Sequence, residues 1–185
     1  TSGSQVAPAD LQPFRWRSWL FACLGQVPPV VSRADELSAL PDYLRRNVQG
    51  HSQEELLFHR LLLSIRSRTN DLAHPRLPAQ DVLQSMKEIA CDVDGALGIV
   101  LCDARRIFAA AVGDMSLAWS RVDGVQSWRE KPLFAGHKPK HTEYPHMKAA
   151  VLVEYSGLLL DGWTAIEQGS AVAFSAEGEV ETLEF

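Results

Sequence analysis

Residues 15–23 read RWRSWLFAC, and this stretch decides the fold class. In a single β-strand, successive side chains point to opposite faces. One face then carries Trp16, Ser18, Leu20 and Ala22, and the other carries Arg17, Trp19, Phe21 and Cys23. Large apolar side chains fall on both faces, which predicts a strand in a sheet that is covered on both sides. Gly25 and the pair Pro28-Pro29 end the strand.

Helical patterns follow this strand. Ser32 is suited to cap a helix that runs to about residue 40, and Pro41 opens another that ends near residue 48. A long leucine-rich helix follows Ser52, because apolar residues recur there at three- and four-residue spacing. A further helix is predicted over residues 79–90.

From residue 95 onward the pattern favours strands. Asp103-Ala104-Arg105 looks like a hairpin turn, and the other polar stretch, 123–147, is predicted to be a long surface loop. The predicted strands cover residues 97–102, 106–112, 116–122, 148–155, 170–174 and 179–185. A block of helices followed by a run of antiparallel strands indicates an α+β fold, and we expect a single domain over residues 1–185.

Composition excludes several classes of protein. The 185 residues are 46% hydrophobic and 22% charged, which is typical of a globular domain. The net charge of −5 argues against a nucleic-acid binder that works by broad phosphate neutralisation. No apolar run reaches the roughly 18–20 residues of a membrane span, so we expect no membrane partner.

The cysteines and histidines predict no metal site and no cofactor. Cys23, Cys91 and Cys102 are an odd number at irregular spacing in apolar surroundings, which favours reduced, mostly buried thiols in a cytoplasmic protein. Cys23 would be a nucleophile only if something lowered its pKa, and no base is evident beside it. The loop histidines His137, His141 and His146 do not have the spacing of a zinc motif.

Short motifs follow one another along the chain in an order that resembles a known family. They are Thr1-Ser2-Gly3, Pro13-Phe14 followed by Trp19-Leu20-Phe21-Ala22, the helix start at residues 50–58, the strand pair at 103–111, and Trp163 with Gly169-Ser170. In that order they resemble the latter part of a class II glutamine amidotransferase domain, of the stand-alone bacterial type that includes the amidohydrolase of ergothioneine biosynthesis. The resemblance implies the N-terminal-nucleophile hydrolase fold, a four-layer αββα sandwich, of which this chain would be the larger C-terminal part.

The resemblance also implies where the working residues would lie. The family's His-Asn-Gly turn supplies an Asn side chain and a Gly backbone N–H to the oxyanion hole, and Cys23, Leu24 and Gly25 stand at these positions. The family's Asp that holds the glutamine ammonium corresponds to Gln53. Leu24 has no hydrogen-bond donor and Gln53 has no charge, so two working positions are replaced. Removal of one oxyanion donor typically costs about 10²–10³ in rate.

Two more residues complete the set of candidates. Ser52 and Glu55 fit the S-x-x-E pattern of a capping box, although Glu55 is also a candidate for substrate binding together with Leu24 and Gln53. Thr1 is a candidate nucleophile, because a free N-terminal Thr can act as nucleophile and base after autocleavage of a precursor. Gly25 would supply a backbone N–H to the oxyanion.

These residues leave the question of enzyme activity open. In one hypothesis the chain is catalytically degenerate and acts as a structural or regulatory subunit. In another it is the active component of a two-chain amidohydrolase that cleaves a γ-glutamyl amide, with the nucleophile on the partner chain or at Thr1. A third has Leu24 and Gln53 reshape the pocket for a different amide. Because a sheet without its first strands exposes unpaired edges, we expect a second polypeptide that carries the N-terminal part of the domain.

Overall fold

The computed structural model describes residues 7–29, 32–69, 72, 77–124, 148–159, 161–175 and 177–185. The helices in these ranges are the 3₁₀ helix η1 (Pro8–Asp10), α1 (Arg33–Ala39), α2 (Asp42–Arg45), α3 (Gln53–Thr69) and α4 (Ala79–Cys91). The strands are β1 (Phe14–Trp16), β2 (Trp19–Gly25), β3 (Leu97–Cys102), β4 (Arg106–Val112), β5 (Leu117–Asp123), β6 (Lys148–Glu154), β7 (Thr164–Ile166), β8 (Ser170–Ser175) and β9 (Val180–Glu184). The four predicted helices and the strands after residue 95 are confirmed, and β7 was not predicted.

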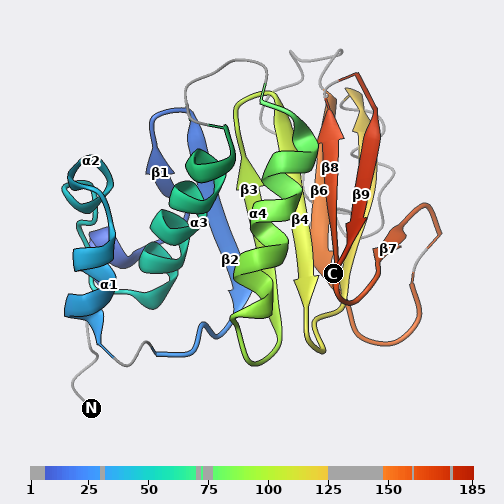
Figure 1. Ribbon diagram of the computed structural model, residues 1–185. Coiled ribbons are helices and arrows are strands. Elements are labelled where there is room, and N and C mark those ends of the chain that lie inside the picture. The colour runs from blue at the N-terminus through green and yellow to red at the C-terminus, as the bar shows by residue number, and fades with distance from the viewer. Residues whose placement is uncertain are drawn as a thin grey trace.

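The strands form two antiparallel sheets. The larger sheet has the order β1-β2-β3-β4-β8-β9, and the smaller has the order β6-β5-β7. Helices α3 and α4 lie side by side on one face of the larger sheet, as Figure 1 shows. The smaller sheet packs on the opposite face through an apolar cluster that includes Ala109, Leu117 and Phe174. The α+β class is therefore confirmed, and the described residues form three layers, so the expected second helical layer stays a prediction.

The stretch at residues 15–23 is not one strand, and that prediction was wrong. Arg17 and Ser18 form a turn, with Arg17 at a φ of 52°, and the chain folds back as a hairpin of β1 and β2. Trp16 lies opposite Trp19 in this hairpin, and opposed residues share a face. A two-residue turn therefore brings Trp16 and Trp19 to one face, whereas a continuous strand would put them on opposite faces.

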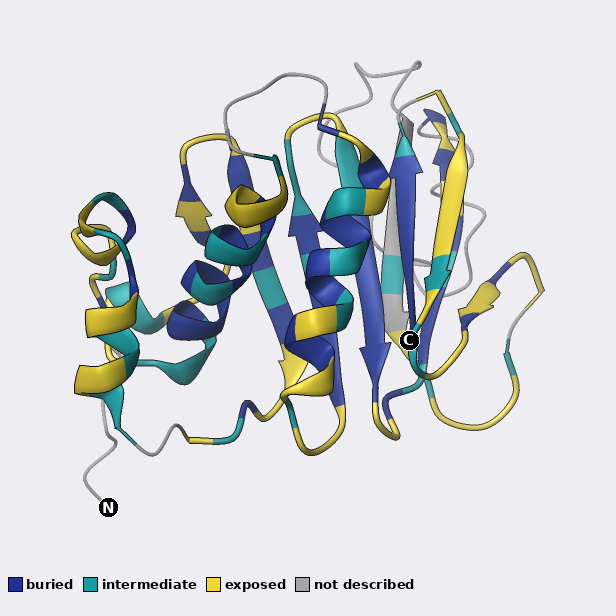
Figure 2. Ribbon diagram, in the orientation of Figure 1, coloured by how far each residue is buried: buried dark blue, intermediate teal, exposed yellow. Residues whose placement is uncertain are grey.

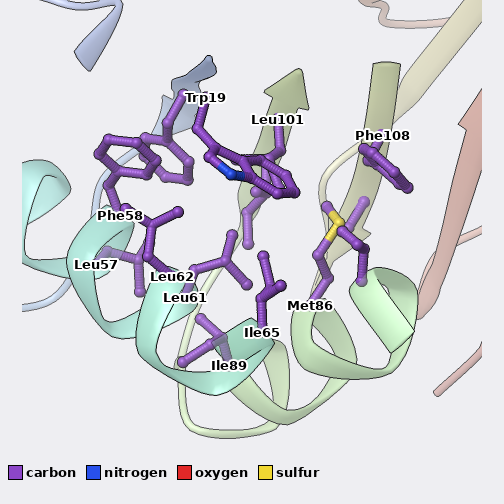
Figure 3. Packing of buried hydrophobic residues seen from close by; sticks show 14 of the residues in the cluster. Trp19, Leu57, Phe58, Leu61, Leu62, Ile65, Met86, Ile89, Leu101 and Phe108 are labelled. Atoms are coloured by element: carbon purple, nitrogen blue, oxygen red, sulfur yellow. The ribbon is translucent and has the colours of Figure 1, made fainter. Parts of the chain in front are cut away.

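The main core lies between this face of the larger sheet and the helices. Trp19, Leu57, Phe58, Leu61 and Met86 are among the buried side chains that meet there (Figure 3). They come from β2, α3 and α4, and the ring of Phe58 stacks on Phe21 of β2 at a centroid distance of 5.3 Å. The indole N–H of Trp19 donates to the carbonyl oxygen of Leu72 at 3.2 Å, so its one polar group is satisfied inside the core.

The opposite face of the larger sheet is only partly covered. Beside the smaller sheet, Ala111 and Val172 are buried, but on β2 Leu20 is 40% exposed and Leu24 is 38% exposed. Figure 2 shows exposed and intermediate residues alternating with buried ones along β2. Coverage on both faces of this strand was predicted, and within the described residues only the helical face of β2 is covered.

The cysteines differ in their exposure. Cys23 is buried, Cys102 is half-buried and Cys91 is exposed, and all three are free thiols. The expectation of a core position for Cys91 was wrong, because Cys91 is the last residue of α4, where the helix runs out of the core. Within the described ranges, no helix combines the length and apolar character needed to cross a membrane.

Candidate functional site

Gly25 ends β2 in a conformation that requires glycine. Its φ is +91°, and a Cβ atom at this position would lie 2.4 Å from the carbonyl oxygen of Ala96. Both the left-handed φ and the close approach of the neighbouring backbone exclude a side chain. The backbone geometry alone therefore accounts for glycine at this position, whether or not its N–H meets an oxyanion.

Gly157 offers a matched control for this claim, because its φ is +88° but no atom of the described residues lies within 4 Å of an added Cβ. Gly157→Ala should lower the free energy of unfolding by about 1–2 kcal/mol, the cost of a left-handed non-glycine residue. Gly25→Ala should cost roughly 1–3 kcal/mol more, because the methyl group also overpacks against Ala96. Urea denaturation of both variants measures the difference, and equal costs would contradict the steric argument.

The thiol of Cys23 is held in an environment that keeps it protonated. Its backbone N–H donates to Gln12 Oε1 at 2.6 Å, and Gln12 Nε2 donates to Cys23 Sγ at 3.6 Å. Burial, followed by the charge of Glu54, raises the pKa of Cys23 from 9.0 to about 12, against a smaller opposing effect of Gln12. A nucleophilic thiol needs the opposite shift. Cys23 is therefore a structural thiol.

The start of α3 is fixed by side chains from two segments. Ser52 Oγ accepts from the Glu55 N–H at 3.2 Å, which is the first half of the predicted capping box. The second half is wrong, because the N–H of Ser52 donates to Asp10 Oδ1 at 2.9 Å. Asp10 Oδ1 also accepts from the His51 N–H at 2.5 Å, so η1 caps the entry to α3 across 41 residues of sequence.

Glu55 has a structural task. Its carboxylate oxygens accept from the N–H groups of Gln49 and Gly50, each at 2.8 Å, and the side chain is buried. Both oxygens are thus engaged by the chain's own backbone. Charge-assisted bonds of this kind hold the turn before α3 in place.

The predicted site residues are only partly brought together. Leu24 and Gly25 end β2, and Gln53 begins α3, whose second residue Glu54 is close enough to Cys23 to raise its pKa. Gln53 lines a hollow of about 330 Å³ together with Val27, and neither Leu24 nor Gly25 lines that hollow. Glu55 does not line it either, because its carboxylate accepts hydrogen bonds from the backbone of the turn before α3. Thr1 lies outside the described residues, as do the three loop histidines.

Three residues that shape this region were missed from the sequence. Asp10 and Gln12 act through long-range contacts to the α3 entry and to Cys23. His59 is 98% buried in α3, where its Nδ1 bonds the carbonyl oxygen of Glu55 at 2.9 Å. A histidine in a leucine-rich run was the available signal. In the part of the chain that the structure describes, no group of three or more His, Cys, Asp or Glu side chains could hold a metal ion.

Comparison with solved structures identifies the fold. A glutamine aminotransferase class-II domain protein from Silicibacter pomeroyi superposes with a TM-score of 0.61 at 16% identity, over 96% of this chain and 71% of that one. A protein described as a predicted glutamine amidotransferase from Pseudomonas aeruginosa PA01 gives a TM-score of 0.58 at 20% identity, over 95% of this chain and 66% of that one. No family model and no curated protein matches the sequence.

The chain therefore has the fold of class II glutamine amidotransferase domains. It spans about two thirds of the length of the two solved proteins. At this level of identity the likeness concerns the fold, and activity has to be argued from the residues of this chain.

Proposed function

We propose that this chain is the C-terminal part of a class II amidotransferase-like protein that does not hydrolyse glutamine and acts as a structural or regulatory subunit. The observation that carries the proposal is Leu24 at the end of β2. Its side chain is 38% exposed on the sheet face opposite the helices, at the position where the resemblance places an oxyanion donor. An isobutyl group there offers no hydrogen bond to a developing oxyanion.

Two neighbouring residues support the same proposal. Gln53 stands where the resemblance places a carboxylate for the substrate ammonium, and a neutral amide supplies no charge to pair with it. Cys23 is too poorly ionised to serve as a substitute nucleophile, with a pKa of about 12. Oxyanion stabilisation, ammonium binding and a local nucleophile are thus all weakened at this end of β2.

The test is glutamine hydrolysis by the full natural polypeptide together with any chain that copurifies with it. We expect no glutamate release above background and no covalent labelling by a diazoketone analogue of glutamine in intact-mass spectra. Leu24→Asn is the matched variant, because it restores an amide donor at the same strand position. Steady glutamate release by the unmodified protein, with labelling of an N-terminal residue, would overturn the proposal in favour of an active amidohydrolase.

We further propose that strands on a second polypeptide cover the exposed face of β2. Leu20 and Leu24 are 40% and 38% exposed on this face, and an apolar sheet face is stabilised when another layer packs on it. Intact-mass measurement and N-terminal sequencing of the purified protein test this. We expect two polypeptides in constant ratio, and a single polypeptide would refute the two-chain arrangement.

A further inference from the structure

A second cavity lies at the β1 edge of the larger sheet, away from Leu24, Gly25 and Gln53. It has a volume of about 800 Å³ and is bounded by η1, β1, α2, the segment before α3 and α3 itself. Figure 1 shows β1, α2 and α3 gathered at this end of the molecule. Small-molecule sites in proteins span roughly 300–1,000 Å³, so the cavity has room for a metabolite-sized ligand.

The lining of this cavity is rich in cations. Arg15, Arg17 and Arg46 are among the residues that line it. Arg15 donates through Nε to the carbonyl oxygen of Arg17, and the guanidinium of Arg17 lies 4.6 Å from the ring centre of Trp16. Within the described ranges, neither Arg15 nor Arg17 has a carboxylate partner.

The acidic groups nearby are already engaged. Glu55 lines the cavity, but both of its oxygens accept from backbone N–H groups. Asp42 on α2 is paired with Arg45 and lies 3.9 Å from Arg46, a long and exposed contact that contributes little. The arginines that line the cavity are therefore largely uncompensated, and planar guanidinium groups suit the oxygens of phosphate or carboxylate.

Two residues that line the cavity each carry a buried polar atom that has no partner within the described residues. His59 Nδ1 bonds a carbonyl oxygen, so Nδ1 carries the hydrogen and Nε2 presents a lone pair. That Nε2 atom and the hydroxyl of Tyr43 are both buried without a hydrogen bond. Burial lowers the pKa of His59, so the ring is neutral at pH 7 and Nε2 remains an acceptor. A buried unpaired acceptor next to a cavity is suited to a ligand that brings a donor.

We propose that this cavity binds a small organic phosphate monoester. A group with two negative charges suits a cluster of arginines better than a single carboxylate does. Apolar lining from Pro13, Phe14 and Trp16 accommodates an organic body, and a hydroxyl or amine of that body donates to His59 Nε2. Leu24, Gly25 and Gln53 do not line this cavity, so ligand binding there does not depend on whether the protein hydrolyses glutamine.

Calorimetric titration of the full natural protein tests this with four probes. AMP and glucose 6-phosphate carry a phosphate on an organic body, inorganic phosphate carries the charge alone, and citrate carries carboxylates alone. We expect at least one of the two esters to bind at submillimolar concentration, about tenfold or more tightly than inorganic phosphate, with an affinity that falls as salt is raised. Failure of both esters, or citrate binding more tightly than either, would overturn the proposal.

Two neighbouring arginines at the end of α2, Arg45 in the helix and Arg46 at its C-cap, provide the matched control. Arg46→Ala should weaken ester binding about tenfold, and Arg45→Ala should change it less than about twofold, because Arg45 does not line the cavity. His59→Asn keeps a donor for the Glu55 carbonyl oxygen but removes Nε2, and it should also weaken binding about tenfold. Equal effects of Arg46→Ala and Arg45→Ala on the affinity, in variants with unchanged thermal unfolding, would show that the cavity is not the binding site.

Discussion

Native alkylation with iodoacetamide is expected to modify Cys91 about a hundredfold or more faster than Cys23. The reagent reacts with the thiolate, and a rise in pKa lowers the thiolate fraction at pH 7.5 more steeply than it raises the nucleophilicity of the thiolate. The pKa of Cys23 lies near 12 instead of 9.0, three units higher, whereas Cys91 is exposed at the end of α4. Burial of Cys23 also restricts access of the reagent, which slows the reaction further.

The measurement is peptide mapping by mass spectrometry over a time course. The same series in concentrated guanidinium is the control, because unfolding removes both burial and the influence of Glu54, and the two cysteines should then react at similar rates. A native rate for Cys23 within about tenfold of that of Cys91 would contradict the structural assignment of this thiol. It would also reopen Cys23 as a candidate nucleophile at the strand end.

Gln12→Ala separates the causes of the raised pKa. The bond from Gln12 Nε2 to Cys23 Sγ favours the thiolate, while burial and Glu54 oppose it. Loss of Gln12 should therefore leave Cys23 as slow as before or slower, provided that the variant remains folded. Faster alkylation in this variant would mean that the side chain of Gln12 mainly shields the sulfur.

Local sequence patterns predicted the parts of the fold that depend on near neighbours. The turn at Asp103-Ala104-Arg105 was predicted because this short stretch lies between two strand patterns. In the structure Asp103 Oδ1 accepts from the N–H groups of Arg105 and Arg106. Ser32 was predicted to cap α1, and its Oγ accepts from the Asp35 N–H. In each case the decisive bond spans two or three residues.

The hairpin of β1 and β2 could not be predicted from alternation alone. A two-residue turn reverses the chain at Arg17 and Ser18. If the stretch is taken as one continuous strand, every residue after Ser18 is assigned to the wrong face of the sheet. No Asn-Gly or Asp-Gly pair marks the turn, because Arg17 and Ser18 occupy it. Apolar residues that belong to one face of the sheet therefore looked like the residues of a single strand that is buried on both faces.

Only those residues of the candidate site that belong to the family's motifs could be predicted from the sequence. The resemblance directed attention to Leu24, Gly25 and Gln53, but it carried no information on residues outside the family's motifs. Asp10 meets His51 and Ser52 across more than 40 residues, a distance at which composition and periodicity give no signal. The arginines that line the second cavity come from the hairpin of β1 and β2 and from the C-cap of α2, and only the fold brings them to one place.

Phe58→Ala is expected to give the largest loss of stability among the substitutions considered. Phe58 is fully buried in α3 between the helices and the sheet, and its ring stacks on Phe21. Truncation of a buried phenylalanine typically costs about 3–5 kcal/mol, because the apolar transfer term is lost and a cavity remains. Leu158→Ala is the control, since Leu158 is 96% exposed and its loss should cost less than about 0.5 kcal/mol.

Urea denaturation of the full natural protein measures both variants, and a double-mutant cycle with Phe21→Ala isolates the contact between the two rings. We expect a coupling free energy of about 0.5–1.5 kcal/mol beyond the two separate truncations, as is typical of aromatic pairs. The pair joins α3 to β2, the strand that ends at Leu24 and Gly25. A coupling near zero would mean that the two rings stabilise the fold independently of each other, and that the other core residues of α3 and β2 hold the helix against the strand.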